Sequence, residues 1–385
     1  MTDIRLFWAQ YEAGATDDLR QRLRNVRWPD SETVADASQG PQLAVMRGLH
    51  EYWLEEYDLC RVQNRLNAFP QFIFNFDGMD IHFIHVRSKE EGAIPLLLAH
   101  GWPGSILEFV DMIDPLTDPA AQGGQRSPAF DVVIPSMPGF GFSGKPSMAG
   151  WNIGKIAGAY AALMQQLGYD RWICQGGDLG SAVAEAIGHM RPQGCAGIHV
   201  NMSFFQPTPQ ELEEADEQER EYLKRAQIYM RDQFGYFHIQ STRPQTIGYM
   251  LADSPMGLAA FLYEKFSESS GVWGSSTPAL TMDQMLDGIC FYWLTNSGAS
   301  AAKLYWELAR SMAGDPPPPI VLPAAYSGFS GETILASRGW LEKRFERLVY
   351  YNLVEEGGHF AAWEQPERFV NELRFAAPAI LSCQF

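Results

Sequence analysis

The stretch on which the fold prediction depends is Gln175-Gly176-Gly177-Asp178-Leu179-Gly180-Ser181. The apolar residues 172–174 before it predict a strand, and residues 181–190 predict a helix. Glycine stands two positions before and two positions after Asp178, and only glycine tolerates the close backbone approach of a tight strand-to-helix turn. Such a turn raises the central side chain above the end of a sheet. The spacing is that of a nucleophile elbow in which a carboxylate takes the place of the nucleophile.

Strands and helices are predicted to alternate on both sides of this turn. Short apolar runs predict strands at residues 81–86, 94–99, 130–134, 172–174, 197–200, 320–327 and 348–354. Longer runs with helical periodicity are found at residues 156–167, 181–190 and 366–375. This alternation is typical of an α/β domain, in which helices flank a mostly parallel central sheet.

Four segments are predicted along the chain. Residues 1–75 contain helical patterns and many aromatic side chains, and are expected to form a strap packed on a larger body. Residues 76–202 are expected to form the first part of the α/β core. Residues 203–315 show no convincing strand and are expected to form a helical cap inserted into the core. Residues 316–385 form the second part, which opens with four consecutive prolines, a stiff linker.

The composition argues against several classes of protein. The 385 residues include 29 Lys and Arg against 46 Asp and Glu, which gives a net charge of −17. An acidic chain without a basic run is not expected to bind nucleic acid or an anionic membrane surface. Neither a membrane span nor a signal peptide is recognisable, so a cytoplasmic protein is expected. The five scattered cysteines and the histidine spacing predict no disulfide framework and no metal site.

A second motif, His100-Gly101-Trp102-Pro103-Gly104-Ser105, directly follows the predicted strand at 94–99. Behind a nucleophile elbow, a loop in this position supplies one of the two backbone amides that stabilise an oxyanion. In this chain that amide belongs to Trp102. The other amide belongs to the residue after the nucleophile, Leu179. Together the two amides are predicted to form an oxyanion hole beside Asp178.

A third motif, Glu356-Gly357-Gly358-His359-Phe360, follows the last predicted strand. The base of a catalytic triad comes last in chain order behind such an elbow, so His359 is the predicted base. A carboxylate is needed to orient the imidazole and to stabilise its cation. Glu332 is expected to do this, because it lies just past the preceding predicted strand. The alternatives lie at strand starts or too near His359, and are Asp315, Glu355 and Glu356.

These motifs together resemble those of the microsomal-type epoxide hydrolases. The resemblance covers nearly the whole chain and includes Arg27-Trp28-Pro29-Asp30, Arg65-Leu66-Asn67-Ala68-Phe69-Pro70-Gln71-Phe72, Pro138-Gly139-Phe140-Gly141-Phe142-Ser143 and Gly358-His359-Phe360-Ala361-Ala362. It implies an α/β-hydrolase fold with a helical cap and an N-terminal strap. Because the family's membrane anchor is absent, the chain is similar to the soluble bacterial members, some of which act in natural-product biosynthesis.

The resemblance also implies two tyrosines in the cap that bind the epoxide oxygen. Gly235-Tyr236-Phe237-His238-Ile239-Gln240-Ser241-Thr242-Arg243-Pro244 is similar to the surroundings of the first, and Lys303-Leu304-Tyr305-Trp306-Glu307 to those of the second. Tyr236 and Tyr305 are therefore the expected pair, with competitors nearby at Tyr249, Tyr263 and Tyr292. The chain departs from the family at Leu179, where tryptophan is common. The amide is unchanged, but the pocket wall becomes smaller.

The implied reaction converts an epoxide into a vicinal diol. Asp178 would attack a ring carbon and form an alkyl-enzyme ester while Tyr236 and Tyr305 hydrogen-bond the epoxide oxygen. Water activated by His359 and Glu332 would then hydrolyse the ester. Neither a cofactor nor a metal is needed.

The expected partner is a small-molecule substrate, an apolar or aromatic epoxide. The aromatic residues of the predicted cap suggest it, although core packing explains the same residues equally well: Phe234, Phe237, Trp273, Trp293 and Trp306. An acidic surface with an aromatic strap would also permit a homodimer.

Three other functions are compatible with parts of the pattern. A haloalkane dehalogenase also uses an aspartate nucleophile, but Leu179 removes the indole that typically binds the halide beside it. A specialised tailoring enzyme would open an epoxide with a group of the substrate itself, or would cleave an acyl or peptide bond. A non-catalytic binding protein would use the same pocket, which the intact triad argues against.

Overall fold

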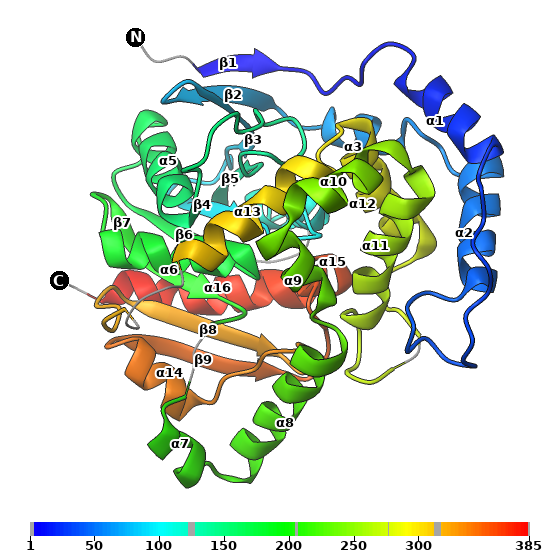
Figure 1. The fold of residues 1–385 in the computed structure, drawn as a ribbon. Helices are drawn as coiled ribbons and strands as arrows, with labels where there is room; N and C mark the ends of the chain where they lie inside the picture. Colours follow the sequence, from blue (N-terminus) through cyan, green and yellow to red (C-terminus); the bar gives the residue numbers. More distant parts are fainter. Residues whose placement is uncertain (1–3, 122–127, 205–206, 276, 312–316, 384–385) are drawn as a thin grey trace.

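The computed structural model describes residues 4–121, 128–204, 207–275, 277–311 and 317–383. Its strands are β1 (Ile4–Phe7), β2 (Gln71–Phe76), β3 (Met79–Val86), β4 (Ile94–Ala99), β5 (Phe130–Pro135), β6 (Trp172–Gly176), β7 (Cys195–Val200), β8 (Ala324–Phe329) and β9 (Leu348–Val354). Within the described residues they form one sheet, in the order β1-β2-β3-β5-β4-β6-β7-β8-β9 (Figure 1). The strands from β5 to β9 in this order pair in parallel, whereas β1, β2 and β3 join antiparallel.

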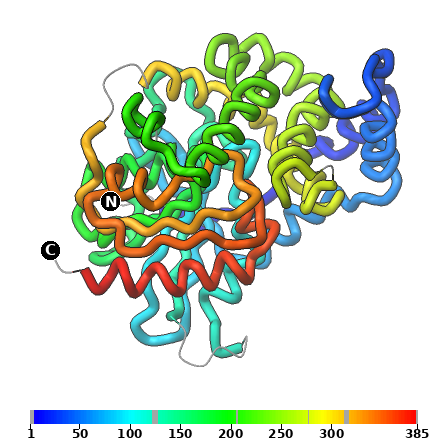
Figure 2. Tube along the Cα trace, turned by 90° about the horizontal axis from the view of Figure 1, so that it is seen from below, coloured from blue at the N-terminus to red at the C-terminus, as the bar shows by residue number. Residues whose placement is uncertain are grey.

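Helices cover both faces of the parallel part of the sheet. One face carries α5 (Ile153–Gln166) and α6 (Leu179–Met190). The other carries α16 (Pro366–Ser382), which packs on β7, β8 and β9 and on η1 (Ile106–Met112) and α4 (Ile113–Thr117) (Figure 2). Strands such as β7 are buried along their whole length because they lie between these two layers. The predicted α/β architecture with a mostly parallel sheet is confirmed.

The N-terminal segment differs from the helical strap that the sequence predicts. Besides α1 (Ala15–Arg24), α2 (Leu43–Glu55) and α3 (Arg61–Leu66), it supplies β1 and β2, which extend the antiparallel edge of the sheet. Phe72 of β2 lies opposite Phe83 of β3, and their rings stack 5.5 Å apart. Such aromatic cross-strand pairs stabilise a sheet edge. The boundary predicted at 75/76 falls inside β2, and the division into four segments stays a prediction.

The cap is helical in the part that the structure describes. It consists of α7 (Pro209–Glu214), α8 (Glu217–Asp232), α9 (Gly235–Thr242), α10 (Pro244–Asp253), α11 (Pro255–Glu268), α12 (Met282–Leu294) and α13 (Gly298–Ser311). The alternative acid Asp315 and the first linker proline, Pro316, lie outside the described residues. The strand predicted at 320–327 begins only at Ala324, and Ile320 forms an isolated bridge with Phe345. The chain then closes with α14 (Arg338–Arg344), β9, α15 (Ala361–Glu364) and α16.

A buried carboxylate joins the N-terminal segment to the cap. Asp287 of α12 has no exposed side-chain surface, and it accepts hydrogen bonds from Tyr57 Oη (2.7 Å), Arg61 Nε (3.0 Å) and Arg65 Nη1 (3.0 Å). Arg65 also pairs with Asp111 of η1, at 2.6 Å. The helices α1 and α2 lie beside α11 and α12 in Figure 1, away from the sheet. The N-terminal segment therefore holds the cap from the side and connects it to the core.

We predict that Asp287→Ala lowers the free energy of unfolding by about 2–3 kcal/mol, because Tyr57, Arg61 and Arg65 lose the buried carboxylate to which all three donate. The change is measured by urea denaturation. Glu342→Ala removes the exposed pair of Arg338 and Glu342, and as the control it should cost less than about 1 kcal/mol. Equal effects of the two substitutions would contradict this account of the cluster.

Candidate active site

The turn between β6 and α6 has the crowded geometry that the sequence predicts. Asp178 adopts φ 49° and ψ −128°, a conformation that costs a residue with a side chain about 1–3 kcal/mol. A Cβ atom on Gly176 would lie 2.0 Å from the carbonyl oxygen of Gly180. A Cβ atom on Gly180 would lie 2.0 Å from the carbonyl oxygen of Ala99 at the end of β4. Both positions therefore require glycine, and the turn holds Asp178 at the N-terminus of α6.

The carboxylate of Asp178 lies against two backbone amides. Oδ1 accepts a hydrogen bond of 2.8 Å from the amide of Trp102, and the amide of Leu179 is a second donor. Gly101 lets the loop approach, since a Cβ atom there would lie 2.3 Å from Oδ1 of Asp178. Burial raises the pKa of Asp178, while His359 and the two amides oppose this rise. The structure thus brings together the predicted nucleophile, Asp178, and both amides named from the sequence.

His359 and Glu332 form a buried pair beside Asp178. Nδ1 of His359 lies 3.0 Å from Oε2 and 3.1 Å from Oε1 of Glu332, and Nε2 lies 3.6 Å from Oδ2 of Asp178. Glu332 follows β8, and its Oε1 also accepts from the amide of Thr333 (2.6 Å). Of the alternative acids, Glu355 and Glu356 are exposed. Among the described candidates, the geometry therefore selects Glu332.

The opposite charges of His359 and Glu332 stabilise each other. Burial lowers the pKa of His359, but the carboxylates of Glu332 and Asp178 outweigh it and raise that pKa to about 10. Burial raises the pKa of Glu332, yet the interactions with His359 and Thr333 outweigh it and hold that pKa below its usual value. The two carboxylates therefore favour the imidazolium form of His359, which lies between them.

The loop that carries His359 is held by groups that sequence reasoning missed. The amide of His359 donates to the carbonyl oxygen of Ser269, just past α11 of the cap (2.8 Å). Glu364 of α15 accepts from the amides of Gly271 (2.7 Å), Gly358 (2.8 Å) and Phe360 (3.0 Å). The contacts of His359 with Ser269 and of Glu364 with Gly271 join the cap to the loop of His359. No sequence motif predicts these two contacts, because they connect segments about 90 residues apart.

The two predicted tyrosines meet above the oxyanion loop. Tyr236 at the start of α9 stacks on Trp102, with ring centroids 4.9 Å apart, and Tyr305 of α13 packs edge-on against the same indole at 5.6 Å. The hydroxyl of Tyr236 is hydrogen-bonded to Tyr229 (2.8 Å) and to Tyr305. Burial raises the pKa of Tyr236 and of Tyr305, so both phenols keep their protons. Tyr229 is a third hydroxyl that the sequence did not suggest.

The competing tyrosines are placed differently. Tyr292 is buried, but its hydroxyl donates to the carbonyl oxygen of Gly104 (2.9 Å), which fixes the loop. Tyr249 is 71% exposed on the surface. Tyr263 is half-buried on α11. The geometry therefore favours Tyr236 and Tyr305 as the hydroxyl pair.

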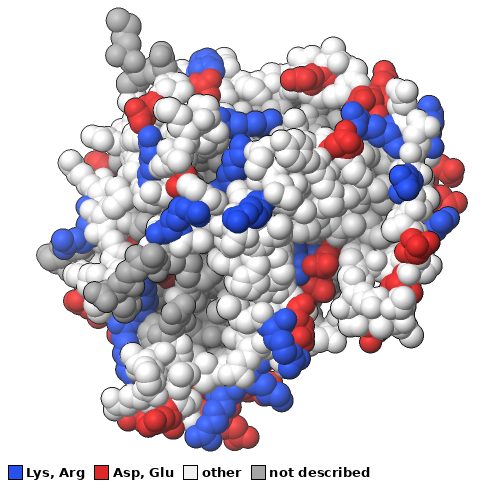
Figure 3. Space-filling view, in the orientation of Figure 1, with Lys and Arg blue, Asp and Glu red and all other residues white. Residues whose placement is uncertain are grey.

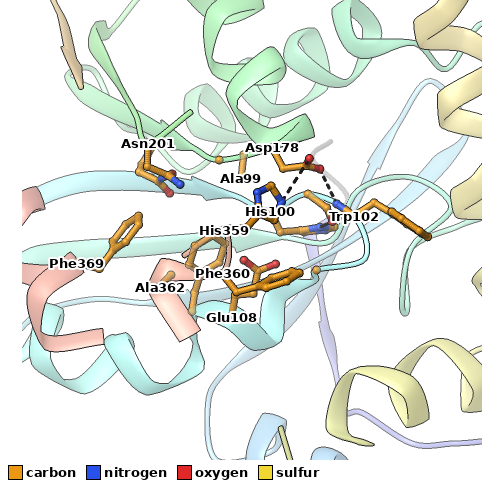
Figure 4. Close-up of a pocket in the computed structure, with 15 residues that line it drawn as sticks. Ala99, His100, Trp102, Glu108, Asp178, Asn201, His359, Phe360, Ala362 and Phe369 are labelled. Carbon is orange, nitrogen blue, oxygen red and sulfur yellow. Dashed lines mark hydrogen bonds and ion pairs between the residues drawn. The ribbon is translucent and has the colours of Figure 1, made fainter. Parts of the chain in front are cut away.

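A small cavity of about 20 Å³ lies beside Asp178 (Figure 4). Its polar wall includes Asp178, His359 and Glu108, and its apolar wall includes Phe360 and Phe369. Among the described residues, no group of three or more His, Cys, Asp or Glu side chains could hold a metal ion. The arrangement brings a carboxylate, an imidazole and hydrogen-bond donors together in one site.

Two family models match the chain. The model described as "Epoxide hydrolase N terminus" matches residues 4–109, and the model described as "alpha/beta hydrolase fold" matches residues 94–246. The first covers the N-terminal segment and the oxyanion loop. The second covers Asp178 and its elbow.

The chain is also similar to named epoxide hydrolases over most of its length. It is 48% identical over 361 residues to a Stigmatella aurantiaca protein that carries a provisional epoxide hydrolase name, covering 94% of this chain and 81% of the relative. It is 31% identical to epoxide hydrolase 1 of Sus scrofa, covering 96% and 88% of the two chains. The solved structure of the Aspergillus niger epoxide hydrolase superposes with a TM-score of 0.87 at 30% identity, covering 98% of this chain and 96% of that one.

We predict that His359 keeps its proton well above neutral pH and titrates at about 10. The usual pKa of 6.5 applies to the unfolded chain, and the pKa in the folded protein is higher. The stability that the charged imidazole contributes is therefore present in full below pH 6.5. It is lost as the pH rises through about 10. NMR of the imidazole nitrogens measures the titration. Asp178→Asn should lower the pKa of His359, since it removes one supporting charge, and titration of the native protein near 6.5 would refute the prediction.

Proposed function

The chain belongs to the epoxide hydrolase family, and we propose that it opens an epoxide by forming an ester on Asp178, which water then hydrolyses to a vicinal diol. One observation carries the proposal. The carboxylate of Asp178 lies in a hole formed by two amides, 3.6 Å from an imidazole that is paired with a second carboxylate. This arrangement fits a nucleophile that is alkylated first and attacked by water afterwards.

Ring opening uses Asp178 together with the hydroxyl pair. One carboxylate oxygen attacks a ring carbon, and the carbon–oxygen bond of the epoxide breaks. Tyr236 and Tyr305 hydrogen-bond the epoxide oxygen and stabilise the alkoxide as its charge develops, and they deliver the one proton that this step consumes. Their raised pKa supports the role, because a protonated phenol can donate.

Ester hydrolysis uses the oxyanion hole and His359. The amides of Trp102 and Leu179 stabilise the oxyanion that forms when water attacks the ester carbonyl carbon of Asp178. Esterification removes the negative charge of Asp178, which helps to raise the pKa of His359. The pKa of the imidazole falls as a result, so His359 becomes a base at the step that needs one. Glu332 keeps its orientation and stabilises the cation that forms again.

The substrate and its setting are a further part of the proposal. The rings of Trp102, Tyr236, Phe237 and Tyr305 pack together at the hydroxyl pair, and they support an apolar or aromatic epoxide. Leu179 in place of tryptophan leaves room for a bulky one, such as an intermediate of natural-product biosynthesis. A hydroxyl pair suits an epoxide oxygen better than a halide, which favours this function over a haloalkane dehalogenase.

The remaining expectations concern partners and location. Among the described residues, no helix is both long enough and apolar enough to cross a bilayer. On the face in Figure 3, basic and acidic side chains are both scattered around broad uncharged areas. The net charge of −17 supports the proposal of a cytoplasmic enzyme that binds neither nucleic acid nor a membrane surface. Assembly into a homodimer stays a prediction.

We predict that His359→Gln traps the ester. After incubation with styrene oxide, mass spectrometry should find one epoxide added to the peptide that contains Asp178, because alkylation proceeds while hydrolysis stalls. Asp178→Asn is the control and should form no adduct, provided that its mass shows the amide to be intact.

A second measurement tests the same two steps in the native enzyme. During one turnover in ¹⁸O water, the label should enter the carboxylate of Asp178 while the diol receives unlabelled oxygen. Solvent label in the first diol would mean direct attack by water on the epoxide, and the mechanism would be wrong. Diol formed with an oxygen or another group of the substrate itself would indicate the tailoring alternative.

We predict that Tyr236→Phe and Tyr305→Phe each slow ring opening on the order of 10²- to 10³-fold, because each removes a donor to the developing alkoxide. Rapid-quench measurement of ester formation gives the rate. Tyr249→Phe is the matched control, since that hydroxyl is on the surface, and it should leave the rate unchanged. An unaltered rate in either buried variant would remove that tyrosine from the mechanism.

A further inference from the structure

Tyr229 places a third hydroxyl beside the two cap tyrosines, and the mechanism above gives it no role. It lies in the last turn of α8, and its Oη is hydrogen-bonded to Oη of Tyr236 at 2.8 Å. Tyr229 is buried, with 7% of its surface exposed. A buried hydroxyl that is bonded to a proton donor can influence the reaction without touching the substrate.

Tyr236 stands in the middle of a chain of three hydroxyls. It is hydrogen-bonded to Tyr229 on one side and to Tyr305 on the other. A hydroxyl has one proton to donate and two lone pairs that accept. When Tyr229 and Tyr305 both donate to Tyr236, the proton of Tyr236 is not used within this chain. That proton is then available to a substrate.

The ring of Tyr236 is held in place, so that mainly its O–H bond is left to rotate. The ring stacks on Trp102, with centroids 4.9 Å apart. Nζ of Lys265 lies 5.3 Å from the ring centroid, and it donates to the carbonyl oxygen of Gln233, just before α9 (3.0 Å). Lys265 is itself only 3% exposed. A hydrogen bond from Tyr229 to the phenol oxygen would fix the remaining rotation.

The helix that carries Tyr229 is tied to the loop of the triad acid. Arg225, one turn earlier in α8, donates from Nη1 to the carbonyl oxygens of Ser330 (2.6 Å) and Glu332 (2.9 Å). Its guanidinium group also lies over the ring of Trp273, 5.3 Å from the centroid. Tyr229 is therefore anchored to the core as well as to the cap, and its hydroxyl is a fixed partner for Tyr236.

We propose that Tyr229 is a positioning residue, whose hydroxyl donates to Oη of Tyr236 and thereby directs the proton of Tyr236 at the epoxide oxygen. Tyr236 is then the tyrosine that transfers its proton in ring opening. Tyr305 exchanges its bond to Tyr236 for one to the epoxide oxygen, and it keeps its proton. The inference deepens the proposed two-step function and rests on it.

The protons balance over the two steps. In ring opening, a carboxylate oxygen of Asp178 bonds to a ring carbon, the carbon–oxygen bond of the epoxide breaks, and that oxygen takes the proton of Tyr236. Tyr236 is left as a phenolate that accepts the hydrogen bond of Tyr229. In ester hydrolysis, one proton of the water passes through His359 to the alkyl oxygen. The other is released from the new carboxyl group of Asp178 and restores the phenol of Tyr236.

The proton affinities agree with this direction of transfer. Burial and the charge of Asp178 raise the pKa of Tyr236, whereas the hydrogen bonds of Tyr229 and Tyr305 lower it. Burial raises the pKa of Tyr229, and the contact with Tyr236 raises it further. Alkylation removes the charge of Asp178, which favours ionisation of Tyr236 as the alkoxide forms. Tyr229 is thus the donor in the pair, and Tyr236 is the phenol that loses a proton.

The test substitutes Tyr229→Phe in the full-length enzyme. Phenylalanine keeps the ring that packs on Phe234, with centroids 5.6 Å apart, and it removes only the hydroxyl. Tyr222→Phe is the matched control, because Tyr222 is buried about two turns earlier in the same helix. Single-turnover rapid quench with styrene oxide follows ring opening and ester hydrolysis separately by intact mass.

The expected result is specific to one step. In Tyr229→Phe, ring opening should slow about 10- to 100-fold, the effect of losing a hydrogen bond to a developing charge. Ester hydrolysis should stay within a few-fold of the native rate, and Tyr222→Phe should behave as the native enzyme. Ring opening at the native rate in Tyr229→Phe would overturn the inference, and so would equal loss of both steps.

A double-mutant cycle tests whether Tyr229 acts through Tyr236. Once Tyr236→Phe is present, Tyr229→Phe should slow ring opening no further, because no phenol oxygen remains to accept its hydrogen bond. Combined with Tyr305→Phe, it should keep its full effect. The same effect in both backgrounds would mean a general distortion of the cap, and the inference would be wrong.

Two unnatural side chains at position 229 separate hydrogen bonding from packing. 4-Aminophenylalanine has nearly the size of tyrosine and donates from its amino group, so it should restore much of the rate of ring opening. 4-Methylphenylalanine has a similar size without a donor, and it should remain as slow as Tyr229→Phe. Equal rates for the two would overturn the inference. The same pair replaces Tyr229→Phe if that variant does not fold.

Tyr236→Phe, measured in the same way, separates this inference from the function on which it rests. If Tyr236→Phe opens styrene oxide at the native rate, the proposed role of the cap tyrosines fails. If Tyr236→Phe is slow and Tyr229→Phe is not, only the role of Tyr229 fails.

Discussion

The structure depends on the close approach of two backbone segments beside Asp178. The elbow between β6 and α6 touches the end of β4 so tightly that Gly176 and Gly180 cannot carry a side chain. This contact sets the amide of Trp102 against the carboxylate at 2.8 Å. The backbone thus holds this donor against the carboxylate, as the proposed oxyanion hole requires. The cost is a strained aspartate, which the surrounding sheet and helices hold in position.

The buried titratable groups beside Asp178 are also coupled to one another. Asp178, Glu332 and Glu108 surround one imidazole in a buried space, so a change in the charge of one group alters the proton affinity of the others. In the proposed mechanism, alkylation of Asp178 is such a change, because it removes one of the carboxylates that raise the pKa of His359. Under that proposal, the ester on Asp178 would allow His359 to act as a base in the second step.

Local spacing explains what the sequence could predict. The elbow, the oxyanion loop and the order of Asp178, Glu332 and His359 follow from short motifs and from strand order. Tyr236 and Tyr305 came only from resemblance to a family, since many tyrosines have similar surroundings. Ser269 and Glu364 could not be found, because their contacts with His359 and with Gly271 join segments that are distant in the sequence. Tyr229 lies near Tyr236 in the sequence but belongs to no motif. Glu108 stands in a Ser-x-x-Glu pattern that predicts a helix cap, and this local meaning conceals its place in the cavity. The strands β1 and β2 were missed because aromatic residues suit a strand edge and a helical strap equally well.

The anchoring of the cap by the N-terminal segment limits how this enzyme can be redesigned. Asp287 receives hydrogen bonds from Tyr57, Arg61 and Arg65, and Arg65 also reaches the core. A chimera that exchanged only the cap would keep Arg61 and Arg65, and it would keep their partner only if the new helix also carried a carboxylate at the position of Asp287. Cap and N-terminal segment are therefore coupled through this one side chain. Recombination between relatives should preserve function best when the crossover points exchange both together.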